Sequence, residues 1–192
     1  MRQNKKKHFV IIAGESSGDG HGAQLIKNLR CKNPELSFSG LGGPEMEKEG
    51  FYSLVPMHRL SVMGFGEVLK NILFFLRLEK LVLQHIQEMR PHKIILIDYP
   101  GFNLHIAKKI RSYVDSKVLY YISPQLWAWK ESRVEIIRKH IDALIVLFPF
   151  ETEWYKKRNI HVEYFGHPLV EQNLPNKKPL LEKKDTYKIA LC

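Results

Sequence analysis

Asp98 is the residue whose type and position most clearly favour chemistry. It directly follows the apolar run Ile94–Ile97, which is rich in β-branched residues and typical of a strand buried on both faces of a parallel sheet. Ligands of open α/β sheets bind beyond the carboxyl ends of the strands, so a carboxylate there is placed to act as a general base. An Asp in this position is also a common cap of the next helix or turn. The stretch alone leaves both roles open.

Acidic residues also follow a second candidate strand. Phe9–Ala13 is apolar and runs into the Gly-rich turn Gly14–Gly22, GESSGDGHG, ahead of a helical pattern. The backbone N–H groups of such a turn can face a ligand at a helix N-terminus. The turn lacks the Lys of a phosphate loop and carries Glu15 and Asp19, which disfavour phosphate and favour a hydroxyl-bearing substrate. The alternative is an ordinary strand-to-helix turn capped by Ser17 or Asp19.

The elements that must position these residues alternate between strands and helices. The other expected strands are Leu36–Gly43 with its Gly turn, Tyr52–Val55, Lys117–Ile122, Ala143–Leu147 and His161–Phe165. The helices are expected at Pro44–Lys48, within Leu60–Met89, after Asn103 as cap, and at Val134–His140 and Phe150–Arg158. This alternation predicts an α/β fold, a doubly wound parallel sheet of about six strands.

The segment Leu60–Met89 is unusually apolar for a helix of a soluble protein. On a 3.6-residue period one face is ready to dock on a sheet, formed by Phe65, Leu69, Ile72, Leu76 and Leu83. A second apolar set lies outside that face: Val68, Phe74, Phe75, Leu78, Leu81 and Val82. With Lys70, Arg77 and Lys80 interleaved, the pattern resembles an interfacial membrane anchor. The alternative is a crossover helix covered by other elements or by a dimer partner.

Composition narrows the class of protein. Lys and Arg number 30 against 20 Asp and Glu, a net charge of +10 that favours an anionic partner. The basic residues are scattered and form no stripe with interleaved aromatics, so nucleic acid is the least supported partner. Cys31 and Cys192 give no disulfide framework, and the nine His residues fall into no metal-ligand spacing. No secretory signal and no membrane-spanning apolar run is found.

Five motifs together resemble the lipid-A-disaccharide synthases, which are inverting glycosyltransferases of GT-B architecture. They occur in the order and at about the spacing of that family, from Phe9 to Glu171. The motifs are AGESSGDGHG (Ala13–Gly22), VMGFGEVL (Val62–Leu69), IDYPGFN (Ile97–Asn103), SPQLWAWKESR (Ser123–Arg133) and YFGHPLVE (Tyr164–Glu171).

The resemblance implies a domain plan. Residues 1–172 are expected to form the Rossmann-like, acceptor-side domain of a GT-B fold, followed by a polar linker at 173–186. Residues 187–192 resemble the first strand of a C-terminal domain that is otherwise missing, with most of the UDP-sugar site. The chain alone is therefore expected to be inactive.

The resemblance also implies a reaction: 2,3-diacylglucosamine is transferred from its UDP derivative to the 6-hydroxyl of 2,3-diacylglucosamine 1-phosphate (lipid X). The products are the β-1′,6 disaccharide 1-phosphate and UDP, and neither metal nor cofactor is required. Asp98 is expected to be the catalytic base. The expected substrate-binding residues are Glu15, Ser16, Ser17, Asp19, Met63, Gly64, Asn103 and Gln125.

A peripheral place on the cytoplasmic face of the inner membrane is expected, and a homodimer is left open. The expected membrane contacts are Val62, Phe65, Val68, Leu69, Ile72, Phe74, Phe75 and Leu76. Two alternatives come from other classes of protein. One is another GT-B-type nucleotide-sugar enzyme such as an epimerase. The other is an inactive truncated half that only binds a membrane or a partner.

Overall fold

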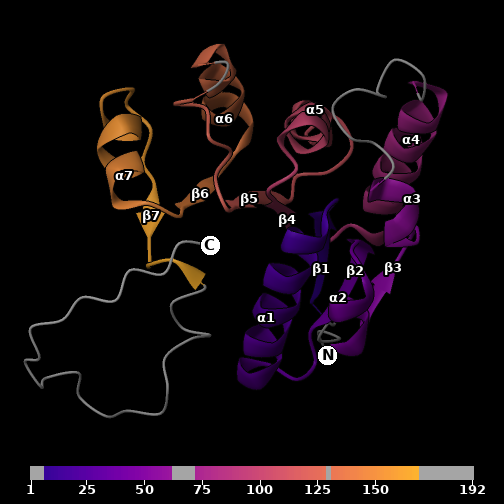
Figure 1. The fold of residues 1–192 in the computed structure, drawn as a ribbon. Helices are drawn as coiled ribbons and strands as arrows, with labels where there is room; N and C mark the ends of the chain where they lie inside the picture. The colour runs from indigo at the N-terminus through magenta and orange to yellow at the C-terminus, as the bar shows by residue number, and fades with distance from the viewer. Residues whose placement is uncertain (1–6, 62–71, 129–130, 169–192) are drawn as a thin grey trace, which may run out of the picture.

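A single sheet of parallel strands organises the chain. The computed structural model describes residues 7–61, 72–128 and 131–168, and within them seven strands lie in the order β3-β2-β1-β4-β5-β6-β7 (Figure 1). The strands are β1 (His8–Ala13), β2 (Ser37–Leu41), β3 (Phe51–Ser53), β4 (Lys93–Ile97), β5 (Lys117–Tyr121), β6 (Ala143–Val146) and β7 (Glu163–Tyr164). The chain reverses its direction across the sheet between β1 and β4, which is the topological switch point where such sheets bind ligands.

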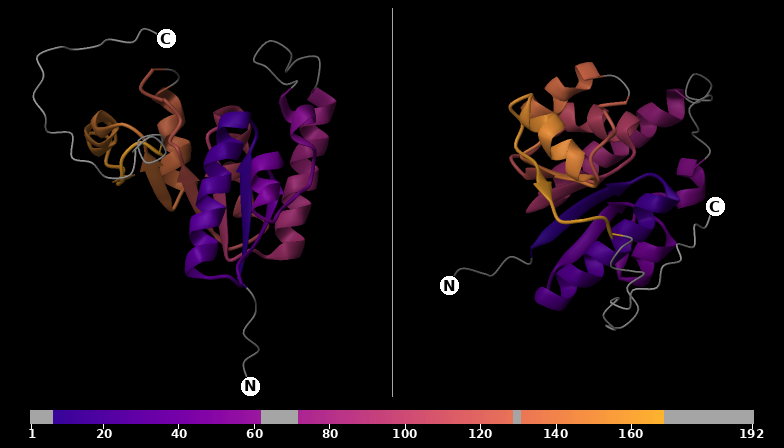
Figure 2. Two further views of the ribbon diagram at one scale, coloured as in Figure 1. Left: turned by 60° about the horizontal axis from the view of Figure 1, so that its bottom comes forward. Right: turned by 60° about the vertical axis from the view of Figure 1, so that its left-hand side comes forward.

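Helices cover both faces of the sheet, as a doubly wound fold requires. The helices are α1 (Ser16–Lys32), α2 (Pro44–Lys48), α3 (Met57–Ser61), α4 (Ile72–Met89), α5 (Pro100–Ile110), the 3₁₀ helix η1 (Glu131–Arg133), α6 (Val134–His140) and α7 (Pro149–Lys156). Figures 1 and 2 show α1 and α2 on one side of the sheet and α5 and α6 on the other. The predicted Rossmann-like α/β fold is confirmed.

The predicted central strand is buried on both faces. Ile94 and Leu96 belong to the apolar core under α4 and α5, whereas Ile95 and Ile97 belong to the core under α1. All four side chains are at most 2% exposed. The alternation follows from the pleat, which points successive side chains to opposite faces. An unbroken apolar run is therefore the pattern this position in a parallel sheet demands.

The predicted docking face of α4 is wrong in its phase. Ile72 and Leu76, which were expected to dock, are 54% and 51% exposed. The residues that pack on the sheet are Leu78, Val82, Leu83 and Ile86, and the first two were expected to lie outside the docking face. A segment with so many apolar positions fits more than one stripe of period 3.6, so packing against α5 and the sheet at β2 decides which stripe is buried.

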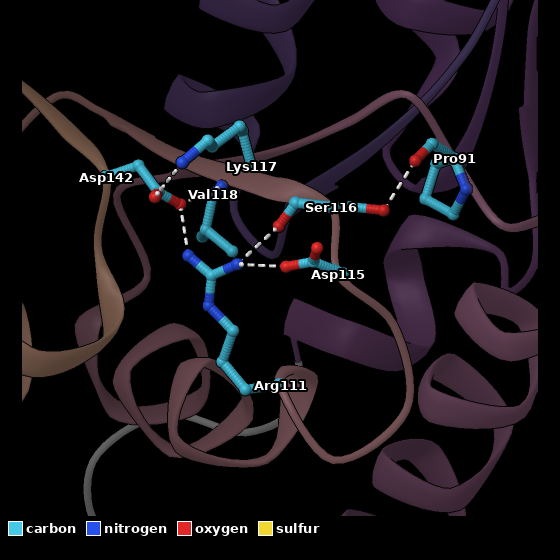
Figure 3. Close-up of polar contacts among 7 residues, drawn as sticks. All are labelled: Pro91, Arg111, Asp115, Ser116, Lys117, Val118 and Asp142. Carbon is cyan, nitrogen blue, oxygen red and sulfur yellow. Dashed lines mark hydrogen bonds and ion pairs between the residues drawn. The ribbon is translucent and has the colours of Figure 1, made fainter.

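The amino edge of the sheet is held by paired polar groups (Figure 3). Asp142, just before β6, accepts hydrogen bonds from Val118 N–H at 2.8 Å and Lys117 Nζ at 3.1 Å, and it also pairs with Arg111. Arg111 Nη1 also donates to the Ser116 carbonyl at 3.1 Å, and the Ser116 hydroxyl donates to the carbonyl of Pro91. These contacts join the end of α5 to the starts of β4, β5 and β6.

Some predictions concern residues whose structure is not described. The linker at 173–186 and the strand at 187–192 lie outside the described residues, as do Val62, Met63, Gly64, Phe65, Val68 and Leu69. Across residues 7–61, 72–128 and 131–168, no helix has the length and apolarity needed to cross a bilayer.

Candidate functional site

A cavity of about 630 Å³ lies at the carboxyl edge of the sheet, a size typical of small-molecule sites. Its polar lining comes from the segments that follow four neighbouring strands. These residues are Glu15 after β1, Asp98 after β4, Ser123, Gln125 and Arg133 after β5, and Glu151 after β6. The structure thus brings together three of the predicted site residues: Glu15, Asp98 and Gln125.

Asp98 is held in a strained and well-supported turn. It is the first residue after β4, half-buried, and its φ of +43° is followed by +47° at Tyr99. Left-handed backbone is costly for residues other than Gly and is concentrated at functional sites. The Asp98 carbonyl accepts hydrogen bonds from Tyr120 Oη and from Asn103 Nδ2, both at 2.7 Å. Burial raises the pKa of the Asp98 carboxyl, with the Tyr99 N–H acting in the opposite sense.

Glu15 is the acidic neighbour of Asp98. It occupies the N-cap of α1 without a side-chain capping bond, so its carboxyl group is not committed to the helix. Burial, and secondly the negative charge of Asp98, raise the pKa of Glu15. Gly14 is required beside it, because any side chain there would overlap the Tyr99 ring. The two acid-bearing turns, after β1 and after β4, therefore lie against each other.

Asp19, a predicted substrate contact, has a structural role and does not belong to the cavity lining. The Asp19 side chain is only 4% exposed and accepts the backbone N–H groups of Gly43 at 2.9 Å and of Glu45 and Met46 at 3.0 Å. Both carboxylate oxygens thus cap the N-terminus of α2, where the helix dipole favours negative charge. A side chain at Gly43 would meet the Asp19 carboxylate, so the two residues require each other.

The other predicted binding residues take different positions. Ser16 and Ser17 are exposed in the first turn of α1, and neither belongs to the cavity lining. Asn103 is not a helix cap, because α5 already begins at Pro100. Its side chain is wholly buried, and Nδ2 donates to the carbonyls of Ile12 (3.3 Å) and Ile97 (3.1 Å) as well as Asp98. Asn103 therefore ties the ends of β1 and β4 together beneath the cavity.

Sequence reasoning missed Glu151, which lies within the expected helix Phe150–Arg158. Its side chain is 1% exposed, and Oε2 accepts the N–H groups of Leu147 at 3.0 Å and Phe148 at 2.9 Å. Oε1 is buried and has no hydrogen-bond partner among the described residues. Burial raises the pKa of Glu151, against the two backbone amides and the Trp127 indole. The rule that singled out Asp98, an acid just beyond a buried strand, could have found it.

Tyr120 was also missed, because it was counted only as part of a strand. It is wholly buried in β5, and burial raises its pKa well above the usual value. A buried Tyr hydroxyl normally has a partner, and here that partner is the Asp98 carbonyl. Tyr120 thus positions the candidate base without lining the cavity.

The predicted membrane contacts divide into two groups. Ile72 and Leu76 are exposed at the start of α4, together with Leu73 at 66%. Phe75 is turned toward the protein, with ring centroids 5.3 Å from Phe102 and 5.5 Å from His105. Phe75 and Phe74 are both half-buried against the core, so they offer less apolar surface to a membrane than Ile72, Leu73 and Leu76 do.

A parallel, doubly wound sheet with an acidic cavity at its switch point defines a Rossmann-like ligand-binding α/β protein. A family model described as "Lipid-A-disaccharide synthetase" matches residues 9–191. The chain belongs to the lipid-A-disaccharide synthase family.

Relatives in that family align with most of this chain. "Lipid-A-disaccharide synthase 1" of Legionella pneumophila (strain Lens) is 40% identical over 85% of this chain and 42% of its own length. The Geobacter sulfurreducens lipid-A-disaccharide synthase is 42% identical over 91% of this chain and 45% of its own length. The chain therefore spans less than half the length of these relatives. A crystal structure of the glycosyltransferase SnogD from Streptomyces nogalater is similar with a TM-score of 0.39 and 13% identity, over 90% of this chain and 47% of that one.

Proposed function

We propose that this chain forms the acceptor side of a lipid-A-disaccharide synthase. The reaction transfers 2,3-diacylglucosamine from its UDP derivative to the 6-hydroxyl of 2,3-diacylglucosamine 1-phosphate, giving the β-1′,6 disaccharide 1-phosphate and UDP. Family membership supports the reaction class. The observation that carries the assignment of roles is Asp98, a half-buried carboxyl group of raised pKa that lines the cavity at the end of the central strand.

Asp98 acts as the general base in this proposal. Its carboxylate takes the proton of the acceptor 6-hydroxyl while that oxygen forms the bond to the anomeric carbon of the donor. The bond from that carbon to UDP breaks in the same displacement, so UDP leaves with the electron pair and the configuration is inverted. A pKa raised by burial makes Asp98 a stronger base than an exposed Asp.

The other polar residues of the cavity suit a sugar. Glu15 and Gln125 offer oxygen and amide groups to the acceptor hydroxyls, and the Ser123 hydroxyl lies deeper on the same wall. Arg133, also in the lining, forms no ion pair among the described residues and is available to an anionic group of either substrate. Family membership disfavours an epimerase or another nucleotide-sugar enzyme.

We also propose that the start of α4 contacts the cytoplasmic face of the inner membrane. Ile72, Leu73 and Leu76 expose apolar surface there, and Arg77 and Lys80 lie exposed on the following turns. Burial of apolar area contributes ~25 cal/mol per Å², and each basic residue near an anionic surface about 1 kcal/mol. The helix runs antiparallel to the strands, so its first turn lies at the same edge of the sheet as the cavity. Acyl chains could therefore stay in lipid while the sugar reaches Asp98.

Asp98→Asn tests the catalytic proposal. It is made in a chimera that continues this chain with the carboxyl-terminal part of a relative such as that of Geobacter sulfurreducens. We expect disaccharide formation to fall about 10²–10⁴-fold, the usual contribution of a general base. Asn tolerates the left-handed backbone at this position, so the fold should survive. Asp115→Asn, at a fully exposed carboxylate (106%), is the matched control. Near-normal turnover by a folded Asp98→Asn protein would remove Asp98 from the mechanism.

A further inference from the structure

Glu151 lines the cavity, and the proposed reaction gives it no task. It lies at the start of α7, just beyond β6. One of its two carboxylate oxygens, Oε2, has a structural role, because it accepts the two backbone N–H groups that open the helix. Oε1 is buried and makes no hydrogen bond in the described parts of the chain, although the nearby Trp127 indole favours the charged carboxylate. Leaving such an atom unpaired is costly, since buried polar groups are almost always hydrogen-bonded.

The charges of the cavity indicate which ligand group would pair with that oxygen. Three carboxyl groups, those of Glu15, Asp98 and Glu151, line the cavity with the single guanidinium of Arg133. An acidic lining disfavours phosphate and favours groups that donate hydrogen bonds, namely hydroxyl and amide N–H groups. An acylated amino sugar carries both kinds of donor.

Asp98 and Glu151 line the same cavity from the segments that follow β4 and β6. β5 lies between β4 and β6, and neighbouring strands are separated by about 4.8 Å, so the two strand ends lie about 10 Å apart. The cavity that both residues line has a volume of about 630 Å³, which is large enough for a sugar ring. One carboxyl group can then hold the ring while the other receives the proton of the reacting hydroxyl.

We propose that Oε1 of Glu151 binds a hydroxyl or amide N–H group of the acylated amino sugar that enters as acceptor. This inference rests on the proposed function and deepens it, because it assigns the acceptor a second anchor on the far wall of the cavity. Glu151 positions the sugar and takes no part in the proton transfer.

Glu151→Gln separates the two tasks of the side chain. The amide oxygen of Gln can still accept the N–H groups of Leu147 and Phe148, so the start of α7 is kept. The amide NH₂ then takes the place of Oε1 and offers donors where the proposal requires an acceptor. Glu153→Gln, at an exposed residue (68%) of the same helix, removes the same charge away from the cavity.

The experiment measures the Kd of the 192-residue chain for 2,3-diacylglucosamine 1-phosphate in detergent micelles, together with thermal melting of each variant. We expect Glu151→Gln to weaken binding about ten-fold or more, the effect of one hydrogen bond to a charged group. Glu153→Gln should bind like the unchanged chain, and all three proteins should melt at similar temperatures.

Equal affinity of a folded Glu151→Gln protein overturns the inference and leaves the proposed function standing. No binding by the unchanged chain overturns both. If Glu151→Gln does not fold, the unchanged chain is titrated with acceptor analogues that each lack one hydroxyl or N–H donor. Loss of one particular donor should then weaken binding about ten-fold. An analogue series without such a loss contradicts the inference.

Discussion

The acidic residues at the two edges of the sheet have pKa values shifted in opposite directions. At the amino edge, Asp142 accepts a backbone N–H and two cationic side chains. Burial alone would raise the pKa of Asp142, but these partners outweigh it and hold the pKa below its usual value. At the carboxyl edge, burial raises the pKa of Asp98, Glu15 and Glu151 above their usual values. Acids at one edge are therefore stabilised in the charged form, and acids at the other are not.

Left-handed backbone occurs at both edges, for example at Arg90 (φ +43°) just before β4. Asp98 and Tyr99 after β4, and Ile122 after β5, all have positive φ, and the value of +68° at Ile122 is unfavourable for a β-branched side chain. The amino edge also has paired polar groups, including a hydrogen-bonded row in which Ser39 Oγ lies 2.7 Å from His8 Nε2 and 2.6 Å from His85 Nε2. The edges therefore differ in their acids: Asp142 at the amino edge is paired and has a lowered pKa, whereas Asp98 at the carboxyl edge has a raised pKa.

The largest expected change in the free energy of unfolding comes from one of two isoleucines of α4. Ile86 lies on the turns near the amino edge and is 0% exposed, whereas Ile72 at the carboxyl edge is 54% exposed. Ile86→Ala should lower the free energy of unfolding by roughly 2–5 kcal/mol, because it opens a cavity in the core. Ile72→Ala should change it by less than about 0.5 kcal/mol. Urea unfolding of both variants measures the difference.

The same comparison tests the membrane proposal. Replacing Ile72, Leu73 and Leu76 together by Ser should leave the circular dichroism unchanged and abolish sedimentation with anionic vesicles. Persistent vesicle binding by that folded triple variant would contradict membrane contact through this surface.

A smaller effect is expected at the amino edge. Asp142→Asn should destabilise the chain by about 1 kcal/mol at pH 7, since its side chain is partly exposed. The pKa of Asp142 is lowered in the folded state, so its contribution is present above the unfolded pKa of about 3.9 and is lost as the pH falls through the folded pKa. The stability curves of the two proteins should therefore converge in acid. A constant difference at all pH values would mean that the charge of Asp142 is not what stabilises this edge.

The smallest expected change in folding stability is a gain, whereas the other substitutions cause losses. The pKa of Asp98 is raised in the folded state, so its charged form destabilises the fold above that pKa, and this penalty disappears in acid below the unfolded pKa. Asp98→Asn should therefore raise the melting temperature at pH 7, by an equivalent of about 0.5–1 kcal/mol. The gain should vanish near pH 3. A loss of stability at pH 7 would show that the carboxyl edge is held together by the charge it carries.

The strands of the sheet could be predicted from the sequence, because each one is marked by a short apolar run and by the residues that end it. Unbroken apolar runs such as Ile94–Ile97 end at Gly, Pro or acidic residues, and each run became a strand within a residue or two of its expected limits. Asp98 and Glu15 were found by the same local rule, because the carboxyl ends of parallel strands meet at one edge.

The contacts of a side chain could not be predicted where its partner is distant in the sequence. Asp19 caps a helix that begins 25 residues later, and Asn103 reaches a carbonyl 91 residues earlier. Neither partnership leaves a periodic signal. The phase of α4 was also unpredictable, because its composition satisfies several stripes and only docking selects one.

Gly14 and Tyr99 have a consequence for motion. The Tyr99 ring occupies the space that a side chain at position 14 would need, so the turn after β1 and the turn after β4 interlock. The two turns that carry Glu15 and Asp98 are therefore expected to move together. A ligand of this cavity would therefore meet two acids whose relative placement is already set, and little conformational entropy would be lost in arranging them.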